Sequence, residues 1–158
     1  MKLRGMSGTA MRLAKQGGSK RPRETDLRRA VSTNYYALFL FLCYILADLW
    51  IGAAPAVRDS LAWHQVSRFL QHGKVMEICS NKKKMSRFPD PIRNFARVFI
   101  IAFQKRVQAD YDSRARFWRY EVIADIIRAK DAMENFMKAP REDRLAFVTL
   151  IALPERTS

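Results

Sequence analysis

The longest apolar stretch of the chain spans residues 34–52 and reads NYYALFLFLCYILADLWIG. No side chain at positions 35–47 carries a charge. Apolar residues recur every three or four positions from 27 to 49, which predicts a long α-helix over 25–51. Because the later turns are apolar on nearly every side, we expect this helix to be the central one of the core.

The same stretch raises the alternative of a membrane span. A span needs about 20 mostly apolar residues, whereas an apolar run of about 10–14 residues is more typical of a core helix. The uncharged run is of the shorter kind, Asp48 would lie inside any longer span, and Pro55 and Arg58 follow it. We predict a buried helix, and we keep a basic membrane-associated protein that uses residues 35–57 as an alternative.

The rest of the chain also carries helical patterns. Helical spacing and boundary residues predict four more helices, at 59–72, 90–109, 120–138 and 143–153. Gly73 is expected to end the first of them, and residues 74–90 read as a polar, basic loop with a short helical start. No segment alternates with period two long enough for a strand. The predicted fold class is therefore all-α, a bundle of about five main helices.

The length of 158 residues fits one domain. Residues 1–23 are expected to be a basic flexible arm, since GGSKRPR interrupts a weak helical pattern. Residues 24–153 form the single helical domain, and 154–158 are a tail. The arm has no apolar segment typical of a secretory signal, so a cytoplasmic location is expected. The two cysteines form no CxxC pair, and we predict no metal and no cofactor.

The chain is strongly basic, with a formal net charge of +14. Such an excess indicates a polyanionic partner, RNA or nucleotide phosphate among them, although a solvated tail and loop would give the same composition. The basic side chains that we expect to bind nucleic acid are Arg28, Arg29, Arg68, Lys82, Lys83, Lys84 and Arg87.

Three segments resemble a known family. LRRAVSTNYYALFLFL at 27–42 resembles the first core helix of HEPN domains (higher eukaryotes and prokaryotes nucleotide-binding), which commonly carries a basic pair, small residues and then YYA. FARVFIIAFQKRVQADYD at 95–112 is similar to the HEPN helix that ends in ADY, and RFLQHGKVMEIC at 68–79 looks like the linking region. The resemblance covers about residues 25–138.

The resemblance implies a helical bundle that forms a homodimer. It also implies a bacterial protein of the toxin or defence type, with an antitoxin or a nucleotidyltransferase-type protein as partner. Many HEPN proteins are metal-independent endoribonucleases with an Arg and a His four to six residues apart. In that chemistry the Arg neutralises the scissile phosphate and the His moves protons. Other HEPN proteins only bind RNA, nucleotides or proteins.

The chain departs from this pattern where the family often has histidine. Leu40 and Val107 occupy those places, so catalysis would need altered residues. Only His64 and His72 remain. Arg58 and His64 match the family spacing formally. Arg68 and His72 are expected to share a helix face, and the negative end of the helix would favour a cationic His72. Such a pair would suit anion binding, and the alternative is that the two residues only cap the helix end at the surface.

Arg106 is the best single candidate for phosphate binding, with His72 and His64 as the candidate catalytic histidines. Asp110 is expected to pair with Arg106 four residues away, and Tyr111 to offer a hydroxyl or a stacking face. The alternative is an intrahelical ion pair and a core tyrosine. Asp48 needs a partner, for which we suggest Arg106. The residues predicted to be structural or to line the cleft are Tyr35, Tyr36, Asp48, Asp110 and Tyr111.

The leading hypothesis is a HEPN-like protein that binds RNA or nucleotide phosphate, with metal-independent cleavage if the site is active. The alternative is a non-catalytic helical dimer that serves as a protein-interaction module. Steeply salt-dependent RNA binding would separate the two, because counterion release accompanies phosphate contacts.

Overall fold

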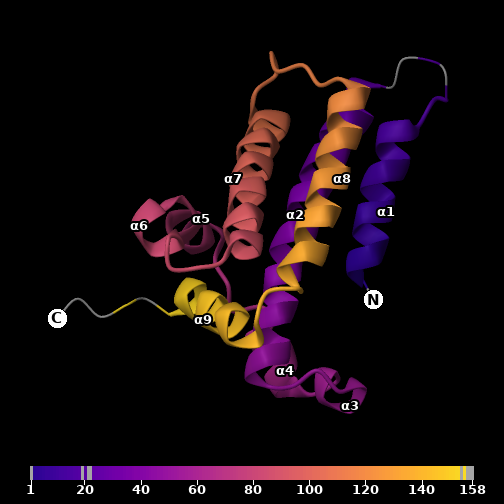
Figure 1. Ribbon diagram of the computed structural model, residues 1–158. Coiled ribbons are helices and arrows are strands. Elements are labelled where there is room, and N and C mark those ends of the chain that lie inside the picture. Colours follow the sequence, from indigo (N-terminus) through magenta and orange to yellow (C-terminus); the bar gives the residue numbers. More distant parts are fainter. Residues whose placement is uncertain (1, 19, 21–22, 154, 156–158) are drawn as a thin grey trace.

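The computed structural model describes residues 2–18, 20, 23–153 and 155, with side chains from residue 5 onward. Within these residues all regular structure is α-helical, which confirms the predicted all-α class (Figure 1). The helices are α1 (Lys2–Lys15), α2 (Glu24–Trp50), α3 (Pro55–Arg58), α4 (Leu61–Val66), α5 (His72–Ser80), α6 (Lys82–Met85), α7 (Asp90–Tyr111), α8 (Arg119–Phe136) and α9 (Arg141–Ala152).

Helix α2 is the centre of the molecule, as its apolar pattern predicts. α1, α7 and α8 run alongside it, and α4 and α9 pack near its C-terminal end (Figure 1). By length and composition α2 could cross a membrane, but 72% of its most apolar window is buried inside the structure. This burial is what a core helix requires, because the neighbouring helices cover the surface that lipid would otherwise solvate.

The main core is rich in aromatic side chains. Phe41 of α2 and Phe95 of α7 pack with their ring centroids 5.5 Å apart, and Phe136 of α8 meets both rings. Phe147 of α9 then packs edge-on against Phe136. One ring from each of four helices therefore joins them in a single core, and burial of such rings is a dominant stabilising term.

The N-terminal segment corrects one prediction. We expected a flexible arm over 1–23, but Lys2–Lys15 forms α1, which packs against α2 and α8. Ala10 and Ala14 are fully buried in a second apolar cluster together with Leu27. Small alanines let the helix backbones approach closely, so α1 docks without a large apolar stripe. Residues 1, 19, 21 and 22 of the predicted arm lie outside the described residues.

The segment between α2 and α7 also differs from the prediction. Instead of one helix over 59–72 and a loop over 74–90, it forms four short helices, α3 to α6. Ser60 accepts a hydrogen bond from the Trp63 amide and caps α4. Gly73, predicted to end a helix, lies in the first turn of α5. Helices of four to nine residues carry too little periodicity to be read from sequence.

Asp48 has the partner that its position demands, but not the predicted one. Its carboxylate accepts hydrogen bonds from Arg58 at 3.0 and 2.6 Å and from the Trp63 indole at 2.9 Å. Arg106 pairs with a different carboxylate, so the suggested Asp48–Arg106 pair is wrong. The Asp48 contacts anchor α3 and α4 to the end of α2.

Candidate functional site

Arg106 lies over two tyrosines of α2. Its guanidinium carbon is 5.6 Å from the centroid of the Tyr35 ring and 5.4 Å from that of the Tyr36 ring. Arg106 Nη2 also donates a hydrogen bond of 3.1 Å to the Tyr36 hydroxyl. The packing of α7 on α2 therefore places a cation against two aromatic faces, an arrangement that holds the guanidinium in position.

Asp110 fixes the other side of the Arg106 side chain. The Arg106 Nε and Asp110 Oδ2 atoms are 2.9 Å apart, which confirms the predicted i,i+4 pair. The contact is an ion pair rather than an aligned hydrogen bond, since Nε has no hydrogen-bond partner among the described residues. Ser32 of α2 donates to Asp110 Oδ1 at 2.5 Å. Asp110 thus forms the intrahelical ion pair with Arg106, and Ser32 links this carboxylate to α2.

His72 completes this group from a third helix. Its Nδ1 lies 2.5 Å from the Tyr35 hydroxyl oxygen, and its ring stacks on Phe39 at a centroid distance of 3.7 Å. Its ring centroid is 6.0 Å from that of Tyr36. We call Tyr35, Tyr36, His72, Arg106 and Asp110 the Arg106–His72 cluster.

The electrostatics of His72 differ from the prediction. Burial lowers the pKa of His72, and the positive charge of Arg106 lowers it further. We expected a cation at a helix C-terminus, but His72 is the first residue of α5, where no negative helix end stabilises a proton. The structure therefore favours a neutral imidazole near neutral pH, which is the form that can accept a proton.

The Tyr35 hydroxyl decides which imidazole nitrogen is free. Burial raises the pKa of Tyr35, so the hydroxyl stays protonated. If Nδ1–H donates to the Tyr35 oxygen, the Nε2 lone pair is available as a base. If Tyr35 donates to Nδ1 instead, Nε2 carries a hydrogen and serves as a donor to an anion.

The other predicted pairs are not brought together. Arg68 is exposed in the segment between α4 and α5, so it shares no helix face with His72. His64 is exposed on α4, beside the Trp63 ring. Arg58, its formal partner by spacing, is bound to Asp48.

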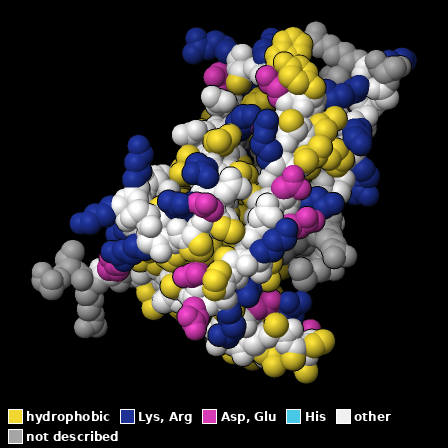
Figure 2. Space-filling view, viewed as in Figure 1, with side chains coloured by type: hydrophobic (Ala, Val, Ile, Leu, Met, Phe, Trp, Pro, Cys, Tyr) yellow, Lys and Arg dark blue, Asp and Glu magenta, His cyan; other side chains and the backbone are white. Residues whose placement is uncertain are grey.

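The predicted nucleic-acid contacts divide into two groups. Arg29, Lys82 and Lys83 are exposed, whereas Arg87 pairs with Glu155 at 2.7 Å and Lys84 lies 3.7 Å from the same carboxylate. Glu155 is the only described residue of the predicted tail; residues 154 and 156–158 lie outside the described part. Figure 2 shows Lys and Arg side chains spread over the visible face rather than gathered in one patch.

Arg28 has a structural role in this fold. Its guanidinium stacks on Phe117 at 5.6 Å and donates to the backbone carbonyls of four residues around the α7–α8 connection. These residues are Gln108, Ala109, Asp112 and Ala115. Arg28 therefore holds the connection in shape, and its donors are occupied.

Sequence reasoning missed a set of exposed aromatic side chains beside this connection. Tyr111 is 78% exposed, which rules out the core-tyrosine interpretation, and Trp118 and Tyr120 are 51% and 70% exposed. Arg114 and Arg116 lie between them in sequence and are exposed as well. The interleaved spacing of aromatic and basic residues was visible in the sequence. Exposed rings next to guanidinium groups suit stacking on unpaired bases.

Neither cysteine is poised for chemistry. Cys43 and Cys79 are free and buried, and burial raises the pKa of each thiol to about 12. Among the described residues, no group of three His, Cys, Asp or Glu side chains is placed to hold a metal ion.

Comparison with family models, curated proteins and solved structures found no match for this chain. The function must therefore be argued from the chemistry of the Arg106–His72 cluster.

Proposed function

We propose that the protein binds RNA and cleaves it without a metal ion at the Arg106–His72 cluster. The supporting observation is the placement of a histidine with a lowered pKa beside an oriented arginine. Arg106 is 5.6 Å from the Tyr35 ring, and Tyr35 itself contacts His72 at 2.5 Å. The net charge of +14 supports a polyanionic substrate.

The chemistry needs one base and one positive charge. Neutral His72 accepts the proton of a ribose 2′-hydroxyl, and the 2′-oxygen attacks the adjacent phosphorus. The bond from phosphorus to the 5′-oxygen breaks, and that oxygen takes a proton back from His72. The products are a 2′,3′-cyclic phosphate and a 5′-hydroxyl. Arg106 stabilises the charge that develops on the phosphoryl oxygens.

The proposal includes a HEPN-like bundle that dimerises. The resemblance of residues 27–42 and 95–112 supports it, since these segments lie in α2 and α7 and contribute both tyrosines and Arg106. The imidazole that the family places in such helices comes from α5 in this chain. The catalytic arrangement would therefore differ from that of the family, because the histidine comes from a different helix.

The exposed apolar residues around α3 and α4 favour a second candidate function, docking of a protein partner. Leu61 is 85% exposed, Phe69 50% and Ile51 39%. Large apolar side chains grouped on a surface are typical of protein contacts. A second copy of the chain, an antitoxin or a nucleotidyltransferase-type protein would fit this candidate.

The test is cleavage of labelled RNA with unpaired and paired regions, in excess EDTA. His72→Ala should abolish cleavage, because it removes the base, and Arg106→Ala should reduce it by about 100-fold or more. His64→Ala is the matched control for the histidine and Arg141→Ala for the arginine. Both control residues are exposed on helices that contribute nothing to the cluster, so their variants should cleave like wild type.

Two outcomes would contradict the proposal in different ways. RNA that binds but is never cut would leave a binding module whose cluster only positions phosphate. Absence of both binding and cleavage would favour the protein-interaction function instead.

A further inference from the structure

The connection between α7 and α8 carries three aromatic rings that lie outside the core. Tyr111 ends α7, Trp118 directly precedes α8, and Tyr120 lies in the first turn of α8. All three residues are more than half exposed to solvent. Single exposed apolar residues are ordinary on a protein surface, but an exposed group of them marks a contact surface. Tyrosine and tryptophan combine an apolar ring with a polar group, which is typical of surfaces that bind a ligand.

Exposed arginines lie between these rings. Arg114 and Arg116 are both exposed, and 96% of the Arg114 side chain is accessible. Asp112 lies 4.0 Å from Arg114 Nε, and its Oδ1 accepts a hydrogen bond of 2.9 Å from the Arg114 backbone amide. Residues 111–120 contain three arginines against one acidic residue, a net charge of +2. The connection therefore favours a ligand that is both aromatic and negatively charged, and unpaired RNA is such a ligand.

The connection is held in place before any ligand binds. From α2, Arg28 stacks on Phe117 and donates to backbone carbonyls at the end of α7 and in the connection. At the start of α8, Arg119 donates to three backbone carbonyls of the α1–α2 segment, those of Gln16, Gly18 and Lys20. A surface that is already ordered loses less conformational entropy on binding than a mobile loop does.

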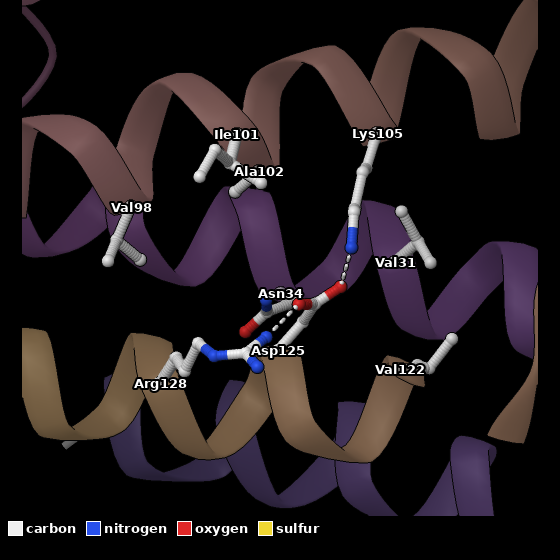
Figure 3. Close-up of a pocket in the computed structure, with 9 residues that line it drawn as sticks. All are labelled: Val31, Asn34, Val98, Ile101, Ala102, Lys105, Val122, Asp125 and Arg128. Atoms are coloured by element: carbon white, nitrogen blue, oxygen red, sulfur yellow. Dashed lines mark hydrogen bonds and ion pairs between the residues drawn. The ribbon is translucent and has the colours of Figure 1, made fainter. Parts of the chain in front are cut away.

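An ion-paired group also joins the two helices that flank the connection. Asp125 of α8 binds Lys105 of α7 and accepts a hydrogen bond of 2.9 Å from Arg128 (Figure 3). The Asp125 side chain is only 17% exposed, so solvent screens this contact less than it would a surface pair. Helices α7 and α8 are therefore fixed to each other near the ends that carry the rings.

One end of this surface borders the Arg106–His72 cluster. Tyr111 directly follows Asp110, whose carboxylate pairs with Arg106. Burial lowers the pKa of this guanidinium, but Tyr36, Asp110 and Tyr111 are close enough to raise it above its ordinary value. A nucleotide next to a phosphate bound by Arg106 would therefore come within reach of the Tyr111 ring.

We call Tyr111, Arg114, Arg116, Trp118 and Tyr120 the stacking surface. We propose that the stacking surface binds single-stranded RNA, with unpaired bases stacked on its rings and phosphates held by its arginines. This inference rests on the RNA cleavage proposed for the Arg106–His72 cluster, and it adds that the substrate is unpaired beside the cleaved phosphate. A paired strand is disfavoured, because its base faces are covered within the duplex.

Fluorescence anisotropy with two labelled oligonucleotides tests the stacking. One is a single strand of about 12 nucleotides of 2′-O-methyl RNA, a length within the range of known single-strand sites. It lacks the 2′-hydroxyl that the proposed cleavage requires, so it stays intact. The other is an abasic strand of the same length and charge. Wild type should bind the first strand at least about 5-fold more tightly, since one stacked base contributes a factor of roughly 5 to 150.

Alanine in place of each ring separates stacking from charge. Tyr111→Ala, Trp118→Ala and Tyr120→Ala should each weaken binding of the base-bearing strand by about 5- to 150-fold and leave the abasic strand unchanged. Tyr120→Phe keeps the ring and should bind like wild type. Leu61→Ala removes an exposed apolar side chain on α4 and is the control for general surface effects. Thermal melting checks that each variant is folded.

Arg114→Gln combined with Arg116→Gln should weaken both strands by a similar factor, because both strands carry phosphates. The inference is overturned if wild type binds the two strands equally or binds neither, or if the three alanine variants keep wild-type affinity. Cleavage of unmodified RNA by wild type is measured alongside. Cleavage without a preference for bases would overturn the stacking surface and leave the proposed function standing. A preference for bases without cleavage would overturn the proposed cleavage and leave the stacking surface standing.

Discussion

Asp48 shows how one carboxylate can organise the end of a helix. Its side chain is 15% exposed, and both of its oxygens accept hydrogen bonds from α3 and α4 residues. Trp63 is buried and has its indole N–H on the same carboxylate. Without Asp48, that donor would be left unpaired in an apolar setting.

We expect Asp48→Ala to lower the free energy of unfolding by about 1–3 kcal/mol, mainly because the Trp63 donor loses its acceptor. The half-exposed Arg58 adds little to this loss, since solvent screens its charge. Urea denaturation followed by tryptophan fluorescence measures the change. Asp59→Ala, at an exposed position close by in sequence, is the control and should stay near wild type. A loss no larger than that of the control would show that the Asp48 contacts do not stabilise the fold.

The lowered pKa of His72 implies that the folded protein loses stability in acid. Its pKa is lowered in the folded state from 6.5 by burial and by Arg106, so the unfolded chain binds the proton more readily. The contribution to stability is complete above about pH 6.5 and is lost as the pH falls from there toward the folded pKa. His72→Gln should therefore lose less stability than wild type between pH 7 and pH 5.

The readout is the free energy of unfolding from urea titrations at several pH values. His64→Gln keeps the cluster intact and should follow the wild-type acid profile. A wild-type profile in His72→Gln would mean that His72 is not held in its neutral form.

A side chain would fit at the glycine of α1 but not at the glycine of the α2–α3 connection. Gly8 lies in α1, and an added Cβ would meet nothing within 4 Å. Gly52 follows α2 with a φ of +140°, and a Cβ there would lie 3.1 Å from Val57. The first glycine is only a weak helix former, while the second is needed for the backbone conformation.

Gly8→Ala should raise the free energy of unfolding by about 0.5–1 kcal/mol, because alanine loses less backbone entropy in a helix. Gly52→Ala should lower it, since the positive φ and the close Val57 contact both oppose a side chain. Thermal melts of the two variants beside wild type test the pair. Destabilisation by Gly8→Ala would imply that α1 is not helical at that position in solution.

The sequence predicted the long helices well for a physical reason. The segments that became α2, α7, α8 and α9 each repeat an apolar pattern over three turns or more, which is enough to specify a buried face. The short helices α3 to α6 lack that length. α1 was missed because its buried positions are alanines rather than large apolar residues.

Only part of the candidate site could be predicted from the sequence. The Arg106–Asp110 pair follows from helical spacing alone, and it is present. The Tyr35–His72 contact joins residues far apart in sequence, so no local sequence pattern predicts it. The state of His72 was mispredicted because the start of α5 was not recognised, which placed the residue at the wrong end of a helix.

The net positive charge of the whole molecule produces an electrostatic field that extends beyond its surface. The +14 excess includes the exposed Lys82 and Lys83, whose neighbours Lys84 and Arg87 are partly neutralised by Glu155. A field of this sign attracts polyanions before any specific contact forms.

We expect RNA affinity to fall linearly with salt on logarithmic axes, as counterion release requires. If Lys82 and Lys83 each contact a phosphate, replacing both with alanine should reduce the slope by up to about 1.4 for a single strand. Fluorescence anisotropy at several salt concentrations gives the slope. Lys74→Ala is the control, because Lys74 already pairs with Glu77. An unchanged slope would place the phosphate path elsewhere on the molecule.

The position of α2 in the chain has a consequence for biosynthesis. This helix is made before α7, α8 and α9, all of which pack against it. At about 5–20 residues per second, a ribosome needs several seconds to go from Trp50 to Phe136. During that interval the nascent chain presents a segment long and apolar enough for a signal anchor. Shielding of this segment by chaperones would favour folding over insertion into a membrane until the later helices have packed against it.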